Sequence, residues 1–481
     1  MGILISYQRL EDDQLRVSFV ACQVVALLLS LVFRYVLSAG RVGVTARHVF
    51  AAAVGMYMAY FCHRWQVIHF LTQSTVCYII ILSSKPSNMH KYVFLFSMLY
   101  LTLCHIYRTY YNFGTYTLDF TGPLMIMTQK VTSLTCALHD GLYRDDSSLS
   151  ADQRKQAVRP LEYYSYVFYF PEVLAIDFNP FPPTDDLIIA APLLTRFGYL
   201  HLSIMMARTK YYFAWSLADA VANAAGLGFN GYDENGNPRW DLISNLNILK
   251  IEFATSLKML IDNWNIQTSL WLKRVCYDRA PSQPVLMVYV LSAMWHGFYP
   301  GYYFTFLGGA VMTPAFRKMR HHLRHHFQGT ARLRQLYDVI TFTSTHFFLN
   351  YTVLPFVLLD WEPTMKFYRS LYFSIHIIVL LVTVLLPYKK QPQPQYAATK
   401  TNGVRTDTNG MVGDHTGCNG TKINNNKVEN GDIHVGHQGQ NGTWSETFCL
   451  RERMLNGMKG FGVPEHNGIS VTPNHVEKKV K

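Results

Sequence analysis

Long stretches of uncharged, mostly apolar residues recur along the chain up to about residue 388. Runs without Asp, Glu, Lys or Arg cover residues 17–33, 65–84, 92–107, 339–359 and 370–386. A helix of about 20 apolar residues spans the hydrocarbon core of a bilayer. Each of these runs therefore predicts a membrane-spanning helix.

Three further apolar segments are shorter or are interrupted by charge, namely residues 49–63, 187–207 and 211–228. Such segments are typical of helices that pack among protein neighbours inside a membrane bundle. All these runs together predict an all-α polytopic membrane protein with about ten to twelve transmembrane or re-entrant helices. No internal repeat is visible, which weighs against a transporter built from inverted repeats.

The longest charge-free run, residues 280–316, contains a histidine. The run is nearly twice the length of about 20 residues that crosses a bilayer, so His296 is expected at membrane depth, where an ionisable group suggests a functional site. Pro300 and Gly301 follow closely and are expected to break the helix. Broken backbone at such depth is tolerated only where it is buried in protein or lines a watery cavity. The pattern therefore predicts that His296 lies on a cavity.

Composition separates the membrane region from a polar tail. Hydrophobic residues make up 49% of the chain and charged residues only 15%, below the roughly 25% of ordinary soluble domains. Mean hydropathy is only +0.06 because the chain from Lys389 onward is rich in Asn, Gly and His and lacks the residues to form a core. We therefore expect a membrane-embedded domain over residues 1–388 and a disordered tail over residues 389–481.

Basic residues predict the orientation and the compartment. The segment 317–334 and Lys389-Lys390 are rich in Lys and Arg, which predicts a cytosolic location for both and for the tail. The acidic N-terminal segment lacks the features of a signal peptide. Lys478 and Lys479 resemble the dilysine retrieval signal of endoplasmic-reticulum membrane proteins. These loops also account for the net charge of +12, so no nucleic-acid partner is needed to explain it.

Two groups of potential metal ligands favour structural roles. The eight cysteines show no CxxC spacing, so they are expected to be buried apolar residues, Cys276 included. His321, His322, His325 and His326 could share a helix face, but no carboxylate or cysteine nearby completes a metal site. We expect a solvated basic loop there and no bound metal.

Four sequence elements stand in a fixed order. They are Trp240-Asp241, the WHGxxxGYxxxF stretch from Trp295 to Phe306, the YxxxxF stretch from Tyr351 to Phe356, and the YxxxYFxxH stretch from Tyr368 to His376. In this combination the sequence resembles the membrane-bound O-acyltransferases, particularly their lysophospholipid acyltransferase branch. Around Asn265 and Trp295 it is most similar to the lysophosphatidylserine and lysophosphatidylethanolamine acyltransferases.

The resemblance implies a set of site residues. His296 and Asn265 would form the catalytic pair. Other motif positions would contact substrate, namely Trp240, Asp241, Trp295, Gly297, Tyr302, Tyr368 and His376. Three basic residues near Asn265 could meet coenzyme A phosphates or serve as ordinary positive flanks of a membrane helix, namely Lys273, Arg274 and Arg279.

Acyl transfer requires groups that this pair can supply. A hydroxyl needs a base to become a good nucleophile, and histidine titrates near neutral pH, which suits His296. An amide such as that of Asn265 could stabilise the tetrahedral oxyanion, by roughly 3–4 kcal/mol for one fixed donor, or could orient the histidine or the alcohol. Acyl-CoA and a lysophospholipid are the expected substrates, in contact with the bilayer, and no cofactor is expected.

Other functions are compatible with parts of the pattern. The same chemistry could serve a protein or sterol acceptor, although the YxxxYFxxH element and the tail length argue against this. A lone intramembrane histidine could also be a packing residue or a transporter's proton relay. Finally, His296 and His376 could ligate a haem.

Overall fold

The computed structural model describes residues 17–18, 20–38, 40–111, 120–144, 159–169 and 191–387. Within these residues the chain is helical, and β-structure is limited to two isolated bridges, Tyr232 with Pro238 and Leu246 with Trp264. The all-α prediction is therefore confirmed. The predicted tail, residues 389–481, lies outside the described residues.

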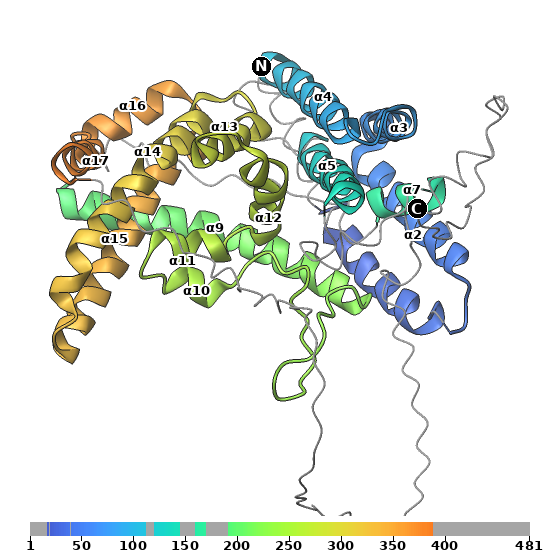
Figure 1. Ribbon diagram of the computed structural model, residues 1–481, viewed down its shortest axis with the longest axis horizontal. Coiled ribbons are helices and arrows are strands. Elements are labelled where there is room, and N and C mark those ends of the chain that lie inside the picture. The colour runs from blue at the N-terminus through green and yellow to red at the C-terminus, as the bar shows by residue number, and fades with distance from the viewer. Residues whose placement is uncertain are drawn as a thin grey trace, which may run out of the picture.

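The N-terminal half forms one side of the molecule (Figure 1). Its described elements are η1 (Val32–Val36), α2 (Val44–His63), η2 (Arg64–Gln66), α3 (Val67–Ser83), α4 (Met89–Tyr111), α5 (Thr121–Tyr143) and α7 (Pro160–Val167). A buried cluster that includes Phe70, Leu101 and Leu124 joins α3, α4 and α5. The same cluster includes Trp271 and Trp295, so this half packs directly against the second half.

The first described helix of the C-terminal half is α9, which runs across the middle of the view (Figure 1). Its elements are α9 (Leu193–Ala224), α10 (Ile248–Glu252), α11 (Leu257–Asn263), α12 (Ile266–Val275), η4 (Tyr277–Arg279), α13 (Pro284–His296), α14 (Pro300–Leu323), η5 (Arg324–Phe327), α15 (Ala331–Leu358), α16 (Trp361–Ser370) and α17 (Ser374–Leu385). Helices α14 to α17 lie opposite α2 to α5, and α12 and α13 lie between the two groups.

Few of the described helices are uniformly apolar over a full membrane span. By length and composition, one helical stretch, Val44–Ser83, could cross a membrane, and a second qualifies if α16 and α17, bent by 74° relative to each other, count as one span. Helix α13 is apolar but short. Many helices instead bury polar side chains against each other, for example Gln73, whose amide donates to Thr128 at 2.7 Å. The number of spans stays a prediction.

The structure tests two places where the sequence pattern is interrupted: the break after His296 and the charged residues between segments 187–207 and 211–228. The break beside His296 is confirmed: α13 ends at His296, and α14 begins at Pro300. By contrast, the segments 187–207 and 211–228 are not separate helices where they are described, because α9 runs through Arg208, Thr209 and Lys210 without interruption. The charged residues interrupt the apolar pattern but not the helix, because Arg208 is buried and pairs with Glu252.

Candidate active site

A cavity of about 1820 Å³ lies between the two groups of helices and holds the predicted catalytic pair. Its wall is formed by side chains from α5, α9, α11, α12, α13, α14 and α15. His296 and Asn265 both lie on this wall, and so does Trp295. The two residues come from different helices, α13 and the start of α12, as expected for groups that face a common substrate.

The His296 ring is enclosed by aromatic rings. Phe306 stacks on it, with ring centroids 5.0 Å apart and planes 20° apart, while Phe356 meets it edge-on at 5.0 Å. Tyr302 and Trp295 complete the enclosure at 5.6 and 4.7 Å. Among the described residues, none forms a hydrogen bond with the His296 ring. The enclosure therefore holds the ring by packing alone.

The end of α13 is fastened to the N-terminal half. The Trp295 indole donates to the Met125 carbonyl at 3.1 Å, and the Trp295 carbonyl lies 3.1 Å from Nε2 of His105. Gly297 follows with φ of 117°, and a Cβ there would lie 3.2 Å from Nδ1 of His105. Only glycine adopts this backbone readily. The chain thus turns sharply behind His296, against a buried histidine of α4.

Gly301 brings α14 into backbone contact with α15. Its N–H donates to the Leu359 carbonyl at 2.7 Å, and a Cβ at this position would lie 2.0 Å from the Pro355 carbonyl oxygen. Phe356, the next residue, is the one that meets the His296 ring. Both glycines of the WHGxxxGY element therefore allow another part of the protein to approach the backbone closely: His105 at Gly297 and the α15 backbone at Gly301.

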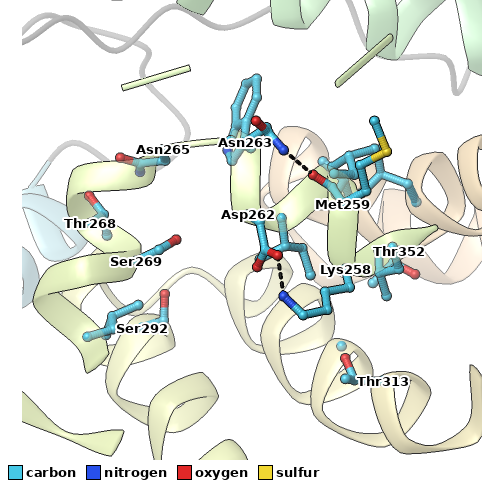
Figure 2. A pocket seen from close by; sticks show the side chains of 18 of the residues that line it. Lys258, Met259, Asp262, Asn263, Asn265, Thr268, Ser269, Ser292, Thr313 and Thr352 are labelled. Atoms are coloured by element: carbon cyan, nitrogen blue, oxygen red, sulfur yellow. Dashed lines mark hydrogen bonds and ion pairs between the residues drawn. The ribbon is translucent and has the colours of Figure 1, made fainter. Parts of the chain in front are cut away.

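Asn265 occupies a left-handed backbone conformation at the N-cap of α12, with φ of 48° and ψ of 54°. Asparagine is among the few non-glycine residues that tolerate this conformation. The position is held by the Asn245 carbonyl, which accepts from the Ile266 N–H at 2.9 Å. The Asn265 side chain makes no capping hydrogen bond. Figure 2 shows it at the end of α12, above Thr268 and Ser269.

The Trp-Asp pair lies in the segment between α9 and α10 and does not line the cavity. Asp241 is exposed and accepts from Arg239 and from Asn230, both at 2.7 Å. These hydrogen bonds lower the pKa of the Asp241 carboxyl. The Trp240 ring packs edge-on against Phe229, with centroids 5.6 Å apart. Arg34 of η1 lies over the Trp240 ring at 5.0 Å, so Trp240 joins its loop to the N-terminal half, while Asp241 bonds within the loop.

Tyr368 and His376 belong to a second cluster. The Tyr351 hydroxyl lies 2.9 Å from Nδ1 of His376, and the rings of Tyr351 and Tyr368 stack with centroids 5.0 Å apart. His376 lines a separate cavity of about 680 Å³. The structure therefore does not bring Tyr368 or His376 to the cavity of His296, and it does not bring the two histidines together for a haem. Only Phe356 of the YxxxxF element reaches His296.

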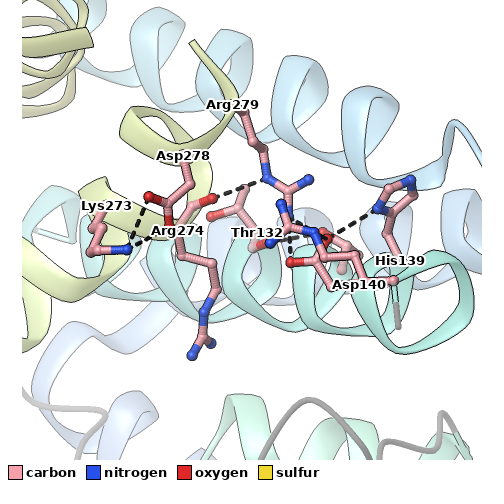
Figure 3. Close-up of polar contacts among 9 residues, drawn as sticks. Thr132, His139, Asp140, Lys273, Arg274, Asp278 and Arg279 are labelled. Atoms are coloured by element: carbon pink, nitrogen blue, oxygen red, sulfur yellow. Dashed lines mark hydrogen bonds and ion pairs between the residues drawn. The ribbon is translucent and has the colours of Figure 1, made fainter. Parts of the chain in front are cut away.

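The three basic residues near Asn265 divide into different roles (Figure 3). Lys273 lines the cavity and pairs with Asp278 at 2.8 Å. Arg279 donates to both carboxylate oxygens of Asp140 on α5, at 2.8 Å, and to the carbonyl of Arg274. Neither arginine lines the cavity. Cys276 is buried and does not line it either.

Sequence reasoning missed the residues that hold the site from a distance. His105 and Met125 contact Trp295 across separations of 190 and 170 residues. His105 lies in the predicted span 92–107, whereas Met125 lies on α5, a helix that no charge-free run predicted. Nothing in the local pattern indicates which helix either residue faces. The only available signal was that His105, like His296, is an ionisable residue within an apolar run.

These features describe a helical membrane protein with a large cavity that His296 and Asn265 line. The model of the membrane-bound O-acyltransferase family matches residues 178–357. The chain is 43% identical to membrane-bound glycerophospholipid O-acyltransferase 2 of Homo sapiens over 443 residues, which cover 78% of this chain and 85% of that protein. It is 42% identical to membrane-bound glycerophospholipid O-acyltransferase 1 of Mus musculus, over 81% of this chain and 93% of that protein.

A further relative is lysophospholipid acyltransferase 6 of Drosophila melanogaster, 37% identical over 83% of this chain and 65% of that protein. The identity and coverage of these relatives leave no doubt about the family. The chain belongs to the membrane-bound O-acyltransferases, and the resemblance seen in its four sequence elements is confirmed.

Proposed function

We propose that this protein transfers a fatty acyl chain from acyl-CoA to the free hydroxyl of a lysophospholipid, with lysophosphatidylserine and lysophosphatidylethanolamine as the expected acceptors. The single observation that carries the proposal is the enclosed His296 on the wall of a large cavity that Asn265 also lines. The relatives named for glycerophospholipid and lysophospholipid acyl transfer support the choice of acceptor.

The proposed reaction is one direct transfer. His296 takes the proton of the acceptor hydroxyl, and the oxygen attacks the thioester carbonyl carbon. The Asn265 amide donates to the oxyanion that forms. The carbon–sulfur bond then breaks, the ester is released, and the coenzyme A thiolate receives the proton held by His296. No covalent acyl-enzyme is required, and the aromatic rings around His296 keep bulk water from competing with the acceptor.

The location of the site follows from the substrates. Acyl chains and lysolipids partition into the bilayer, whereas coenzyme A is highly charged and stays in water. Of the three basic residues predicted to meet coenzyme A phosphates, Lys273 is the one that lines the cavity. We therefore propose it as the contact for a coenzyme A phosphate. We further propose residence in the endoplasmic-reticulum membrane with the tail in the cytosol, on the basis of the basic segment 317–334 and the terminal lysines.

The test is an acyl-transfer assay of purified protein with a panel of lysolipids, 1-acylglycerol, a sterol and acyl-CoAs. We expect transfer to lysophospholipids, and we expect His296→Ala to lower it by at least about 100-fold, the lower range for loss of a general base. His325→Ala is the matched control, because His325 is exposed and lies outside the cavity. A His296→Ala variant that keeps a tenth of wild-type turnover would remove His296 from the mechanism, and transfer only to a sterol would overturn the acceptor.

A further inference from the structure

Arg208 places a buried guanidinium on the wall of the same cavity. It lies near the middle of α9, and its side chain is only 6% exposed. One terminal nitrogen donates to Glu252 of α10 at 3.1 Å, and the other reaches the Asn350 side-chain oxygen of α15 at 3.5 Å. Glu252 also accepts from the Tyr212 hydroxyl at 2.5 Å. The guanidinium is thus held from two helices in one orientation.

A buried ion pair of this kind is weak support for folding. Removing two charges from water costs free energy that their attraction repays only with good geometry and further hydrogen bonds. The Glu252 carboxylate is 24% exposed, four times as much as Arg208, so the positive group is the more deeply buried partner. Within a membrane domain, such an ionisable group on a cavity suggests a role in ligand binding.

The guanidinium has donors left over. Arginine carries five N–H groups in a fixed plane. The hydrogen bonds to Glu252 and Asn350 occupy two of them, and the Tyr212 hydroxyl also lies beside the guanidinium. The Nε–H is buried and has no acceptor among the described residues. A phosphate with two free oxygens matches this arrangement, because arginine binds phosphate through paired hydrogen bonds.

We propose that Arg208 binds the phosphate of the lysophospholipid acceptor and thereby makes the enzyme discriminate lysophospholipids from phosphate-free lipids. This inference rests on the proposed acyl-transfer function. Glu252 and Asn350 are positioning residues, since their hydrogen bonds fix the orientation of the guanidinium.

The spacing along α15 fits this assignment. Asn350, which contacts Arg208, and Phe356, which contacts His296, are six residues apart on one helix. At a rise of 1.5 Å per residue the two positions are separated by about 9 Å along the axis. Helix α15 thus contacts both Arg208 and His296 within about two turns. Thr352 and Val353, between them, also line the cavity.

Coenzyme A carries phosphates too, so the source of the phosphate must be tested. Its several charges favour a site open to water, whereas the Arg208 side chain is only 6% exposed. A lipid phosphodiester with a single negative charge suits that position better. The acyl-CoA dependence of the variants therefore serves as a separate arm of the experiment.

The experiment measures kcat and KM of purified full-length protein for a lysophospholipid, for 1-acylglycerol with the same chain, and for acyl-CoA. For Arg208→Gln we expect kcat/KM for the lysophospholipid to fall roughly 10- to 100-fold, the worth of a hydrogen bond to a charged group. The values for 1-acylglycerol and acyl-CoA should stay within about two-fold. Arg332→Gln, at an exposed position in the first turn of α15, is the matched control.

Three results would overturn the proposal. The first is an equal loss of kcat/KM for the lysophospholipid and for 1-acylglycerol, which would indicate a structural role. The second is an increase of KM for acyl-CoA alone, which would assign the phosphate to coenzyme A. The third is unchanged kinetics. If Arg208→Gln does not fold, Arg208→Lys keeps the charge but loses the planar fork, and it should show the same selective loss to a smaller extent. Absence of transfer to lysophospholipids by the wild type would instead refute the proposed function.

Discussion

Replacing Gly301 by alanine tests whether the contact between α14 and α15 shapes the active site. An added Cβ would lie 2.0 Å from the Pro355 carbonyl oxygen and 2.9 Å from the Leu359 Cα. Both obstacles are backbone atoms, so no side-chain rotation can relieve the overlap. Because such contacts are essentially never shorter than 3.0 Å, the two helices would have to separate by about 1 Å.

This displacement would reach His296 through Phe356, which follows Pro355 and meets the His296 ring edge-on. It would also break the hydrogen bond from the Gly301 N–H to Leu359. A misplacement of 1 Å near reacting groups can lower the rate about 100-fold, and overpacking costs typically 1–3 kcal/mol of stability. We therefore expect Gly301→Ala to lower kcat by about 100-fold and to lower the Tm.

The assay is acyl transfer by detergent-purified protein, with thermal unfolding measured on the same sample. Gly308→Ala provides the matched control, because it lies on the same helix and a Cβ there meets nothing within 4 Å. Its activity should stay within about two-fold of wild type. Gly301→Ala protein with near-normal turnover and Tm would refute the close approach and its effect on His296.

Two further predictions concern Asn265 and the topology. Asn265→Gly keeps the left-handed backbone but removes the amide, so kcat and kcat/KM should fall together, as they do when a transition-state contact is lost. Asn265→Asp should also lose activity, because a carboxylate repels the oxyanion. An Asp variant as active as wild type would exclude the oxyanion role. A tag inserted after Lys389 should be cleaved by protease added to sealed microsomes, and a protected tag would invert the proposed topology. Replacing Lys478 and Lys479 by serine should let some protein leave the endoplasmic reticulum.

The sequence alone determined the class of fold and the site's central residue. Charge-free runs predicted helices because a bilayer selects about 20 apolar residues for each span. Pro300 and Gly301 predicted the break beside His296, since proline begins helices and glycine permits close approach. The order of the four sequence elements identified the family. These are local or compositional signals, so they can be recognised without knowing which helices touch.

The sequence was less informative about the functions of the individual motif positions. Trp240, Asp241, Tyr368 and His376 share the motif pattern with His296, yet they lie in other parts of the structure. The charged group at Arg208 suggested an interruption between two segments, but α9 continues through it. A charged residue inside an apolar pattern is ambiguous, because a loop and a helix with buried ionic partners produce the same local sequence.

Only the tertiary structure decided which residues surround His296 and which line its cavity. His105 and Met125 fix Trp295 from helices far away in the chain, and Arg208 meets Glu252 and Asn350 from two other helices. Helical periodicity shows which residues share a face, but the partner of that face depends on how all the helices pack together. The sequence therefore specified the histidine that we propose as the base, and the packing of distant helices specified its surroundings and the proposed phosphate site.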